Sequence, residues 1–180
     1  ENANIGLESH QGSVTLFNAL NGTPLAIMDA GQITAIRTAA VSGLATRILA
    51  KKNSKILAIL GSGIQARTHI EAMTTILNLE EIRVWSKNKK NAKKLVEEQR
   101  KKYAIPFRPF DTVNEAIYNA DIICTTTAAV EPILHGKHLM QGVHINAVGS
   151  SVRNTRELDG FAIKLSKLYV DKIESTINES

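Results

Sequence analysis

The sequence predicts an α/β protein built on a doubly wound parallel sheet, together with a β-hairpin that belongs to a second structural unit. Three observations predict this architecture. Strand-like and helix-like segments alternate from residue 56 to the end of the chain, which is typical of right-handed βαβ units. A glycine-rich turn follows a strand that is apolar on both faces. A hairpin signal near the amino terminus stands alone, without neighbouring strands to complete its sheet.

Composition allows one sizeable hydrophobic core and argues against several classes of protein. The 180 residues are 43% hydrophobic, which argues against disorder and fibrous structure. The net charge of +5 suits an anionic ligand, but the basic residues do not form the clustered face of a nucleic-acid-binding protein. We therefore expect no nucleic-acid partner.

Three features of the sequence bear on where the protein is located: its apolar runs, its cysteine content and its first residues. No apolar run approaches the roughly 20 residues that span a bilayer, so we expect no membrane association. The one cysteine, Cys124, cannot form an intrachain disulfide or a multi-cysteine metal site, which favours a reducing, cytoplasmic location. No basic segment followed by an apolar stretch opens the chain, so we expect no secretory signal in the given sequence. The first residue is Glu1 and not Met, so we expect a fragment of a longer protein.

Residues 13–18 and 24–28 are predicted to form a hairpin around Asn21-Gly22, because this dipeptide favours a tight two-residue turn. A lone hairpin is marginally stable in water. Its remaining sheet partners are therefore expected outside this chain or in a second subunit.

Residues 33–50 are predicted to form an amphipathic helix. Its apolar positions fall on one stripe at about 100° per residue: Ile33, Ala40, Val41, Leu44 and Ile48. Arg37 lies inside that stripe, at about 40° from Ile33. An arginine in a core-facing stripe is costly unless it reaches solvent, pairs with a carboxylate or meets an anion fixed in a cleft. The last alternative makes Arg37 a candidate clamp for a substrate carboxylate.

Six strands are predicted for the parallel sheet: residues 56–60, 82–85, a short stretch near 107, 121–126, 144–149 and 168–171. A helical pattern follows the first strand, and a lysine-rich helix follows the second. Thr112 and Glu115 form a capping box that opens the next helix. The order predicts a single Rossmann domain.

Residues 61–66, Gly-Ser-Gly-Ile-Gln-Ala, match the G-x-G-x-x-G/A pattern of dinucleotide-binding turns. Gly61 suits the tight turn after the strand, and Gly63 lets the backbone approach a pyrophosphate. Ala66 permits close packing of the helix on the sheet, and the helix N-terminus offers free N–H groups to the anion.

The end of the next strand indicates which dinucleotide is bound. Enzymes that use NAD usually place Asp or Glu there, whereas this chain has Ser86-Lys87-Asn88 followed by Lys89 and Lys90. Lys87, with Ser86 and Asn88 as further donors, could hold a 2′-phosphate, so we predict NADPH as the cofactor. The alternative is that the lysines are the solvated start of a helix, and this applies to at least one of them.

Two later segments end strands at the carboxyl edge of the sheet, where ligands bind in open α/β folds. Thr125, Thr126 and Thr127 follow one strand, and Gly149 follows another. The five histidines show no metal-ligand spacing, so we expect no metal site. Of these histidines, only His10 is a candidate for the site.

Several segments together resemble the ornithine cyclodeaminase and mu-crystallin family over nearly the whole chain. They are Ser9-His10-Gln11, residues 33–42 (ITAIRTAAVS), residues 61–66 (GSGIQA), residues 131–134 (EPIL) and residues 144–149 (HINAVG). The chain is most similar to the mu-crystallin branch, whose members are NADPH-dependent ketimine reductases that also bind thyroid hormone.

The resemblance implies a function, which we state as expectations. Residues 1–32 would be part of a substrate and dimerisation domain, residues 33–175 would be the cofactor-binding Rossmann domain, and the protein would be a homodimer. Arg37 and His10 would bind a cyclic ketimine or an amino-acid-like substrate. The residues expected to bind the cofactor are Arg37, Thr38, Gly61, Gly63, Ile64, Gln65, Ser86, Lys87, Asn88, Asn91, Thr125, Thr126, Thr127, Val148 and Gly149.

One departure sorts the branches of the family. Cyclodeaminases and related alanine dehydrogenases carry an aspartate two residues after the glycine of I-N-A-x-G, where this chain has Ser151. The resemblance therefore favours imine reduction. Two alternatives stay open: a non-catalytic, NADPH-dependent binder of a small ligand such as an iodothyronine, and cyclodeaminase or alanine dehydrogenase activity. No residue of this chain is assigned as the proton donor. The resemblance implies that the family's substrate-binding lysine would lie upstream of Glu1.

Overall fold

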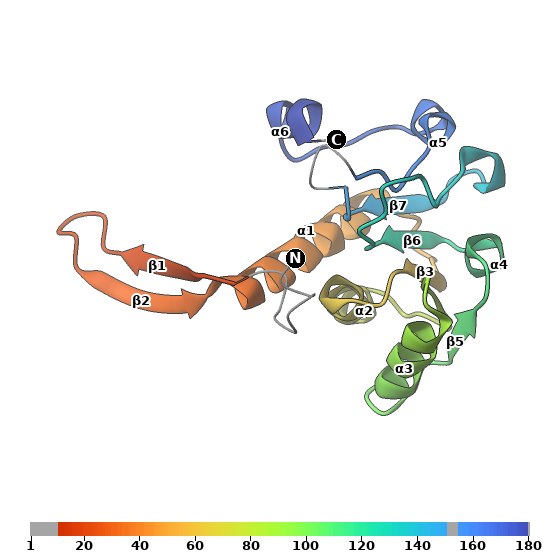
Figure 1. The fold of residues 1–180 in the computed structure, drawn as a ribbon, viewed down its shortest axis with the longest axis horizontal. Helices are drawn as coiled ribbons and strands as arrows, with labels where there is room; N and C mark the ends of the chain where they lie inside the picture. The colour runs from red at the N-terminus through yellow and green to blue at the C-terminus, as the bar shows by residue number, and fades with distance from the viewer. Residues whose placement is uncertain (1–10, 151–154, 180) are drawn as a thin grey trace.

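The structure, a computed structural model, describes residues 11–150 and 155–179 (Figure 1). A five-stranded parallel sheet forms the centre of the main body, in the order β5-β4-β3-β6-β7. The strands are β3 (Ile56–Leu60), β4 (Glu81–Trp85), β5 (Phe107–Phe110), β6 (Ile122–Thr125) and β7 (His144–Ala147). The chain runs from β3 outward to β5 and then returns to place β6 and β7 on the other side of β3. This reversal is the doubly wound arrangement that the sequence predicted, and it is confirmed.

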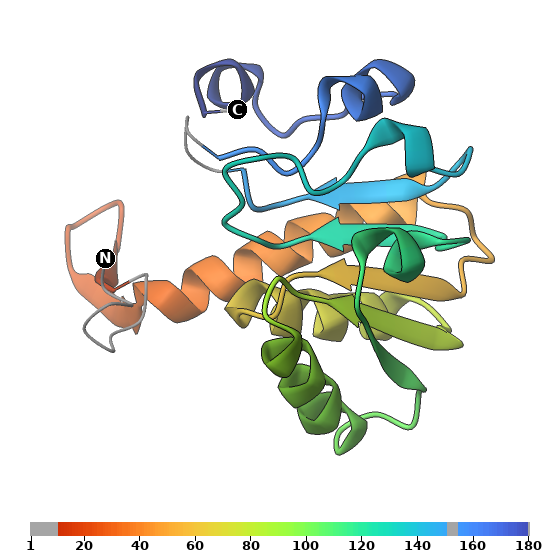
Figure 2. The same ribbon diagram turned by 45° about the vertical axis from the view of Figure 1, so that its right-hand side comes forward.

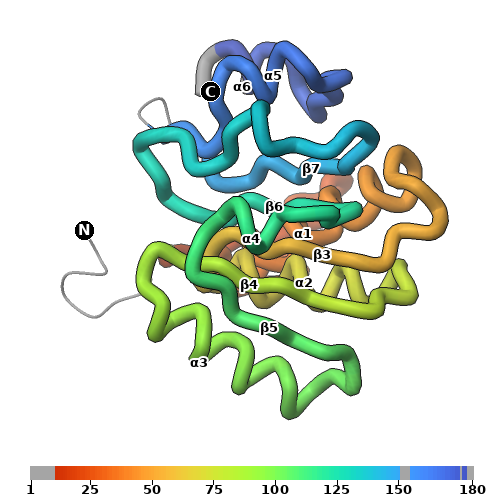
Figure 3. The backbone as a smooth tube through the Cα atoms, turned by 90° about the vertical axis from the view of Figure 1, so that its right-hand side faces the viewer, coloured from red at the N-terminus to blue at the C-terminus, as the bar shows by residue number. Residues whose placement is uncertain are grey.

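Both faces of the sheet are covered (Figures 2 and 3). On one face, α2 (Ile64–Ile76) and α3 (Lys89–Arg100) pack on the side of β3 that carries Leu57 and Ile59. On the other face, α4 (Val113–Ile117) and the segment around Leu134 cover Ala58 and Leu60. The apolar run of β3 is continuous because successive side chains enter two different cores. Thr112 forms the predicted capping box at the start of α4.

The predicted sixth strand at 168–171 is wrong. After α5 (Gly160–Leu165) the chain runs without regular structure to α6 (Ile173–Glu179). Leu168, Tyr169 and Val170 are 60%, 54% and 40% exposed. Their apolar character suits a strand, but a strand forms only where a neighbouring backbone accepts its hydrogen bonds, and no sheet of the described residues includes this segment.

The predicted hairpin is confirmed. β1 (Ser13–Phe17) pairs antiparallel with β2 (Pro24–Asp29), and Gly22 in the connection has a φ of 73°. The connection spans residues 18–23, so it is longer than the two-residue turn that Asn21-Gly22 suggests. Both strands are largely exposed and extend away from the main body (Figure 1). The hairpin meets the rest of the described chain chiefly through α1 (Ala30–Leu49), whose N-cap is Asp29.

The orientation predicted for the first long helix is wrong. The face of α1 that packs on the main body carries small residues, namely Ala35, Ala39, Ser42, Gly43 and Thr46. Small residues let α1 approach α2 closely, and a Cβ placed on Gly43 would lie 3.6 Å from Ala72 Cβ. The apolar stripe points away, so that Val41, Leu44 and Ile48 are 50%, 50% and 68% exposed. Arg37 in the same stripe is exposed, and its charge is solvated within this chain. Among the described residues, no helix is long and apolar enough to cross a membrane.

Candidate functional site

Most of the predicted site residues lie in loops at the carboxyl edge of the sheet. The loops after β3, β4, β6 and β7 all leave the sheet at this edge because the strands are parallel. The point at which the strand order reverses lies between β3 and β6. Open α/β sheets bind their ligands in the crevice outside the carboxyl ends of the strands at such a point.

Gly61 makes the tight turn after β3. Its φ of 131° is one that L side chains rarely adopt, and its N–H donates to Trp85 O at 2.8 Å. A Cβ at this position would lie 2.6 Å from Thr126 O and also overlap Thr126 Oγ1. Gly61 is therefore required for the close passage of the loop after β6.

Gly63 has a different environment, although it belongs to the same motif. It is exposed, a Cβ built on it meets no atom within 4 Å, and it caps α2 without a side-chain hydrogen bond. The first N–H groups of α2 thus face open space, and a helix N-terminus of this kind attracts phosphate.

Two buried polar atoms near this edge have no hydrogen-bond partner among the described residues: Gln65 Oε1 and Thr125 Oγ1. Buried polar atoms without partners are rare and often indicate a missing ligand or water. Both atoms are closed to solvent, so it is the open approach at Gly63 that fits a dinucleotide with its pyrophosphate against the N-terminus of α2.

Arg67 holds the glycine loop in place, a role that the sequence did not reveal. Its Nη1 donates to Ser62 O at 2.8 Å and to Gly63 O at 3.0 Å, while Nε and Nη2 bind the Glu98 carboxylate of α3. Hydrogen bonding to Arg67 is the largest cause that lowers the pKa of Glu98. The two residues are 31 positions apart, so no local pattern could have shown the pair.

The end of β4 separates the lysines into two groups. Lys89 is paired with Asp111 at 3.0 Å, whereas Lys87 is exposed and forms no ion pair with a described residue. Asn88 is the N-cap of α3 and accepts from Lys90 N, and Asn91 is exposed on the first turn. Ser86 is buried, and its hydroxyl lies 2.9 Å from that of Ser62, so the ends of β3 and β4 are connected.

The hydroxyl groups of the threonines at the end of β6 and directly after it face the protein. Thr125 is fully buried, Thr126 Oγ1 donates to Leu60 O at 3.1 Å, and Thr127 Oγ1 donates to Glu157 Oε1 at 2.7 Å. Val148 N donates to Thr125 O, which extends the pairing of β6 and β7 by one bond. The predicted contacts of these residues with a cofactor stay predictions.

Helix α1 contacts the glycine motif about one turn before Arg37 and Thr38. Gln65 Nε2 of the glycine loop lies 3.5 Å from Thr34 O, one turn before Thr38, and Thr38 Oγ1 also donates to Thr34 O. Arg37 is exposed beside this contact, without an ion-pair partner among the described residues. His10 and Ser151, the other residues singled out from the sequence, lie outside the described residues.

A buried polar network fixes α1 on the main body. His69 Nε2 lies 2.9 Å from Ser42 Oγ, and Asn146 Nδ2 donates to Thr46 Oγ1 at 2.9 Å. Desolvation lowers the pKa of His69 and raises the pKa of Cys124 to about 12, so the imidazole stays neutral and the thiol stays protonated. The network sets the register of the helix that carries Arg37, and it supplies no nucleophile.

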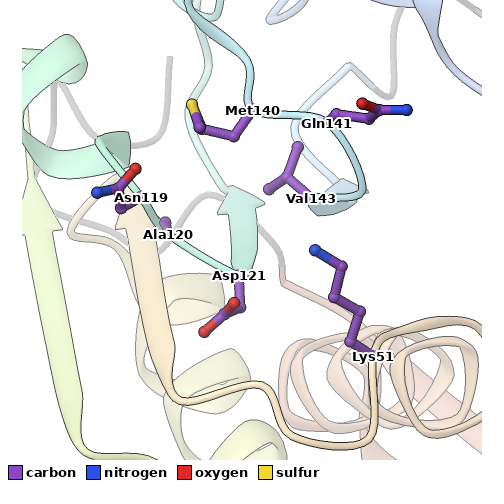
Figure 4. A pocket seen from close by; sticks show the side chains of 7 residues that line it. All are labelled: Lys51, Asn119, Ala120, Asp121, Met140, Gln141 and Val143. Carbon is purple, nitrogen blue, oxygen red and sulfur yellow. The ribbon is translucent and has the colours of Figure 1, made fainter.

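A cavity of about 250 Å³ lies at the opposite edge of the sheet (Figure 4). It is lined by Lys51, Asn119, Ala120, Asp121, Met140, Gln141 and Val143. Asp121 Oδ2 already accepts from Lys55 N and Ile56 N, which fixes the start of β3. Since this edge carries the amino ends of the strands, the cavity is not where the fold binds cofactors. No group of metal-binding side chains is present in the part of the chain that the structure describes.

Comparisons with known proteins agree with this geometry. A family model described as "Ornithine cyclodeaminase/mu-crystallin family" matches residues 1–180. Ketimine reductase mu-crystallin of Mus musculus is 43% identical over 99% of this chain and 56% of its own length.

Two solved structures extend the comparison. The Thermococcus litoralis Δ(1)-pyrroline-2-carboxylate reductase in complex with NADH and L-proline is 44% identical, with a TM-score of 0.96 over 100% of this chain and 56% of that one. An archaeal alanine dehydrogenase dimer with bound NAD is 32% identical, with a TM-score of 0.92 over 98% of this chain and 54% of that one. The chain therefore spans about half the length of the relatives it matches.

Proposed function

The chain belongs to the ornithine cyclodeaminase/mu-crystallin family, and we propose that the intact protein reduces the C=N bond of cyclic ketimine carboxylates with NADPH. The observation that carries the proposal is the open N-terminus of α2 at Gly63, which has no side-chain cap. The exposed Arg37 lies on α1, about one turn after Thr34, whose carbonyl oxygen is 3.5 Å from Gln65 Nε2 of the glycine motif. The first feature suits a pyrophosphate, and the second suits the carboxylate of a substrate.

The residues of this chain bind and orient in the proposed reaction. When bound, the nicotinamide cofactor supplies the hydride. Arg37 would hold the substrate carboxylate through a charge-assisted pair of hydrogen bonds. This would limit the orientations that the imine bond of the substrate can take in the site. The polar network at Ser42 and Thr46 would fix the position of α1, and with it Arg37, relative to α2 and β7.

The preference for NADPH over NADH is supported by the end of β4. Residues 86–90, which follow β4, include no carboxylate, and the nearby carboxylate of Asp111 is paired with Lys89. Lys87 is exposed and forms no ion pair with a described residue. The T. litoralis relative is in complex with NADH, which supports a nicotinamide cofactor here. The preference for NADPH therefore rests on Lys87 and is tested by changing it.

The exposed surfaces support a larger assembly. We assign residues 1–32 to a substrate and dimerisation domain and residues 33–175 to the cofactor domain; the boundary falls within the first turn of α1. The exposed hairpin and the apolar stripe of α1 suit burial against the rest of a homodimer. The lone, buried cysteine supports a cytoplasmic location.

The test is reduction of a panel of cyclic ketimine carboxylates by the intact protein, followed as NADPH oxidation. Arg37→Met keeps the stem and removes the charge, so kcat/KM should fall by at least about tenfold. Arg47→Met, on the exposed last turn of the same helix, is the matched control and should retain activity.

Three results would contradict the proposal. Absence of turnover together with binding of an iodothyronine would favour a ligand-binding protein. NAD-dependent deamination of alanine or ornithine would favour the other branches of the family. Unfolding of Arg37→Met without a specific kinetic defect would make Arg37 a structural residue.

A further inference from the structure

The carboxylate of Glu157 is buried between the loops that follow β6 and β7. The residue is 0% exposed. Its Oε1 accepts from Thr127 N at 2.6 Å and from Thr127 Oγ1 at 2.7 Å, and its Oε2 accepts from Gly149 N at 2.7 Å. The paired residues of β6 and β7 end at Thr125 and Ala147. Glu157 therefore connects the two strands beyond the point where their ladder ends.

The backbone of Glu157 is fixed as firmly as its side chain. Its carbonyl oxygen accepts from Ile133 N and Leu134 N, each at 2.9 Å, and its N–H donates to Ser150 Oγ at 3.0 Å. Leu158 forms a bridge with Leu134 immediately afterwards. The carboxylate is thus held from a third segment that packs beside both loops, and it cannot move without disturbing them.

Gly149 shows how little space this arrangement leaves. A Cβ placed on it would overlap Thr127 O and would lie 2.6 Å from Glu157 Cδ. The backbone after β7, the carbonyl of Thr127 and the carboxylate are therefore in close contact. The absence of a side chain at Gly149 is needed for this contact within the protein.

The location of this contact relative to the glycine loop indicates its role. A dinucleotide with its pyrophosphate at Gly63 would extend its adenosine half over the end of β4, where Ser86 and Lys87 lie. Its other half would extend across the switch point, over the ends of β6 and β7. Thr127 and Gly149, which Glu157 connects, are in the loops at those ends.

We propose that Glu157 is the positioning residue for the nicotinamide half of the cofactor site, because it fixes the spacing and orientation of the loops after β6 and β7. The inference rests on the proposed function, since it requires a dinucleotide at this edge. Glu157 is not a catalytic residue: it is fully buried, and its oxygens are engaged by Thr127 and Gly149.

The three donors explain why a carboxylate suits this position. An ionised carboxylate is an acceptor at both oxygens, so it can receive N–H groups from two loops that face each other. An amide would turn its own NH₂ group towards either Thr127 N or Gly149 N and lose that connection. Aspartate keeps the charge, but its shorter side chain would not reach both loops from the fixed backbone.

The experiment compares two probes on the intact protein, folded at the temperature of measurement: NADPH, and 2′,5′-ADP as the adenosine half alone. In Glu157→Gln and Glu157→Asp the affinity for NADPH should fall by at least about tenfold, as expected for loss of hydrogen bonds to a buried charge. The affinity for 2′,5′-ADP should change by less than about twofold, because the adenosine half would bind at the end of β4, away from the loops that Glu157 connects. Glu131→Gln, the same charge change on an exposed residue nearby, should alter neither affinity.

The outcomes are distinguishable. Equal losses for both probes, or unfolding of both Glu157 variants, would assign Glu157 to general stability and overturn the inference. Unchanged NADPH affinity in both variants would overturn it as well, while the proposed function would stand. Failure of the unmodified intact protein to bind NADPH would overturn the proposed function itself, and the inference with it.

Discussion

Gly61 and Gly63 belong to one sequence motif, yet the structure predicts opposite results when each is changed to alanine. Gly61→Ala should destabilise the fold, whereas Gly63→Ala should leave the fold intact and weaken cofactor binding. The difference arises from their surroundings: one is enclosed by the backbone after β6, and the other faces open space.

The cost at Gly61 can be estimated from two contributions. A side chain at a φ of 131° adds roughly 1–3 kcal/mol of backbone strain. A Cβ 2.6 Å from Thr126 O adds overpacking of roughly 1–3 kcal/mol. Thr126 cannot easily retreat, because its N–H donates to Leu60 O at 2.7 Å. The total of about 2–6 kcal/mol should lower Tm by at least about 4 °C.

Gly63→Ala should lower the free energy of unfolding by no more than about 1 kcal/mol, the cost of alanine at a helix N-cap, since the φ of −82° is ordinary and no atom lies within 4 Å of the new Cβ. The added methyl group would occupy the space through which a pyrophosphate approaches, so NADPH affinity should fall by at least about tenfold.

The assay is thermal unfolding of both variants of the intact protein, followed by titration with NADPH. A wild-type Tm for Gly61→Ala would show that the turn relaxes around the added atom and would refute the steric argument. Wild-type NADPH affinity for Gly63→Ala would show that the cofactor does not approach the backbone at this glycine, which would refute the assignment of the site.

Three further predictions concern charge, pH and the extent of the chain. Lys87→Asp should weaken NADPH binding by about 1.5–3 kcal/mol and have little effect on NADH binding. The control Lys93→Asp makes the same charge change on the exposed face of α3 and should affect neither cofactor. If Lys87→Asp weakens both cofactors equally, Lys87 does not bind the 2′-phosphate. Burial lowers the pKa of His69 below its ordinary value of 6.5, so the unfolded chain gains a proton that the native chain does not, and stability should fall as the pH drops below about 6.5. Urea unfolding at several pH values should show a shallower fall for His69→Gln than for the wild type, with His138→Gln, an exposed histidine, as the unchanged control; identical slopes would place the effect elsewhere. Residues 1–180 alone should bind NADPH measurably but weakly and should not reduce ketimines above background. The reason is that the chain spans about half the length of its relatives. Robust turnover would show that these residues carry every essential group.

Local chemistry made a large part of the fold predictable. The hairpin follows from turn residues, the order of strands and helices from hydrophobic periodicity, and the glycine turn from a motif whose spacing has a steric cause. The location of the predicted cofactor residues also follows, because parallel strands bring their carboxyl ends to one edge.

Packing decided the remaining features, because they depend on partners distant in sequence. The apolar stripe of α1 suggested a core-facing surface, but the small face opposite it allows the closer approach to α2. Residues 168–171 have the composition of a strand, but no backbone of the described residues pairs with them. Periodicity shows that a face is apolar, and it cannot show which surface will cover that face.

The buried polar contacts illustrate the same limit. Glu157 is 30 residues from Thr127, and Asn146 is 100 residues from Thr46, so no local pattern distinguishes these side chains from exposed ones. The sequence determined the hairpin, the order of the five parallel strands and the glycine turn, which depend mainly on neighbouring residues. Only the tertiary structure decided which polar groups fix the loops and the helix around the site, because a hydrogen bond at 2.6–2.9 Å requires that the whole fold bring its two atoms together.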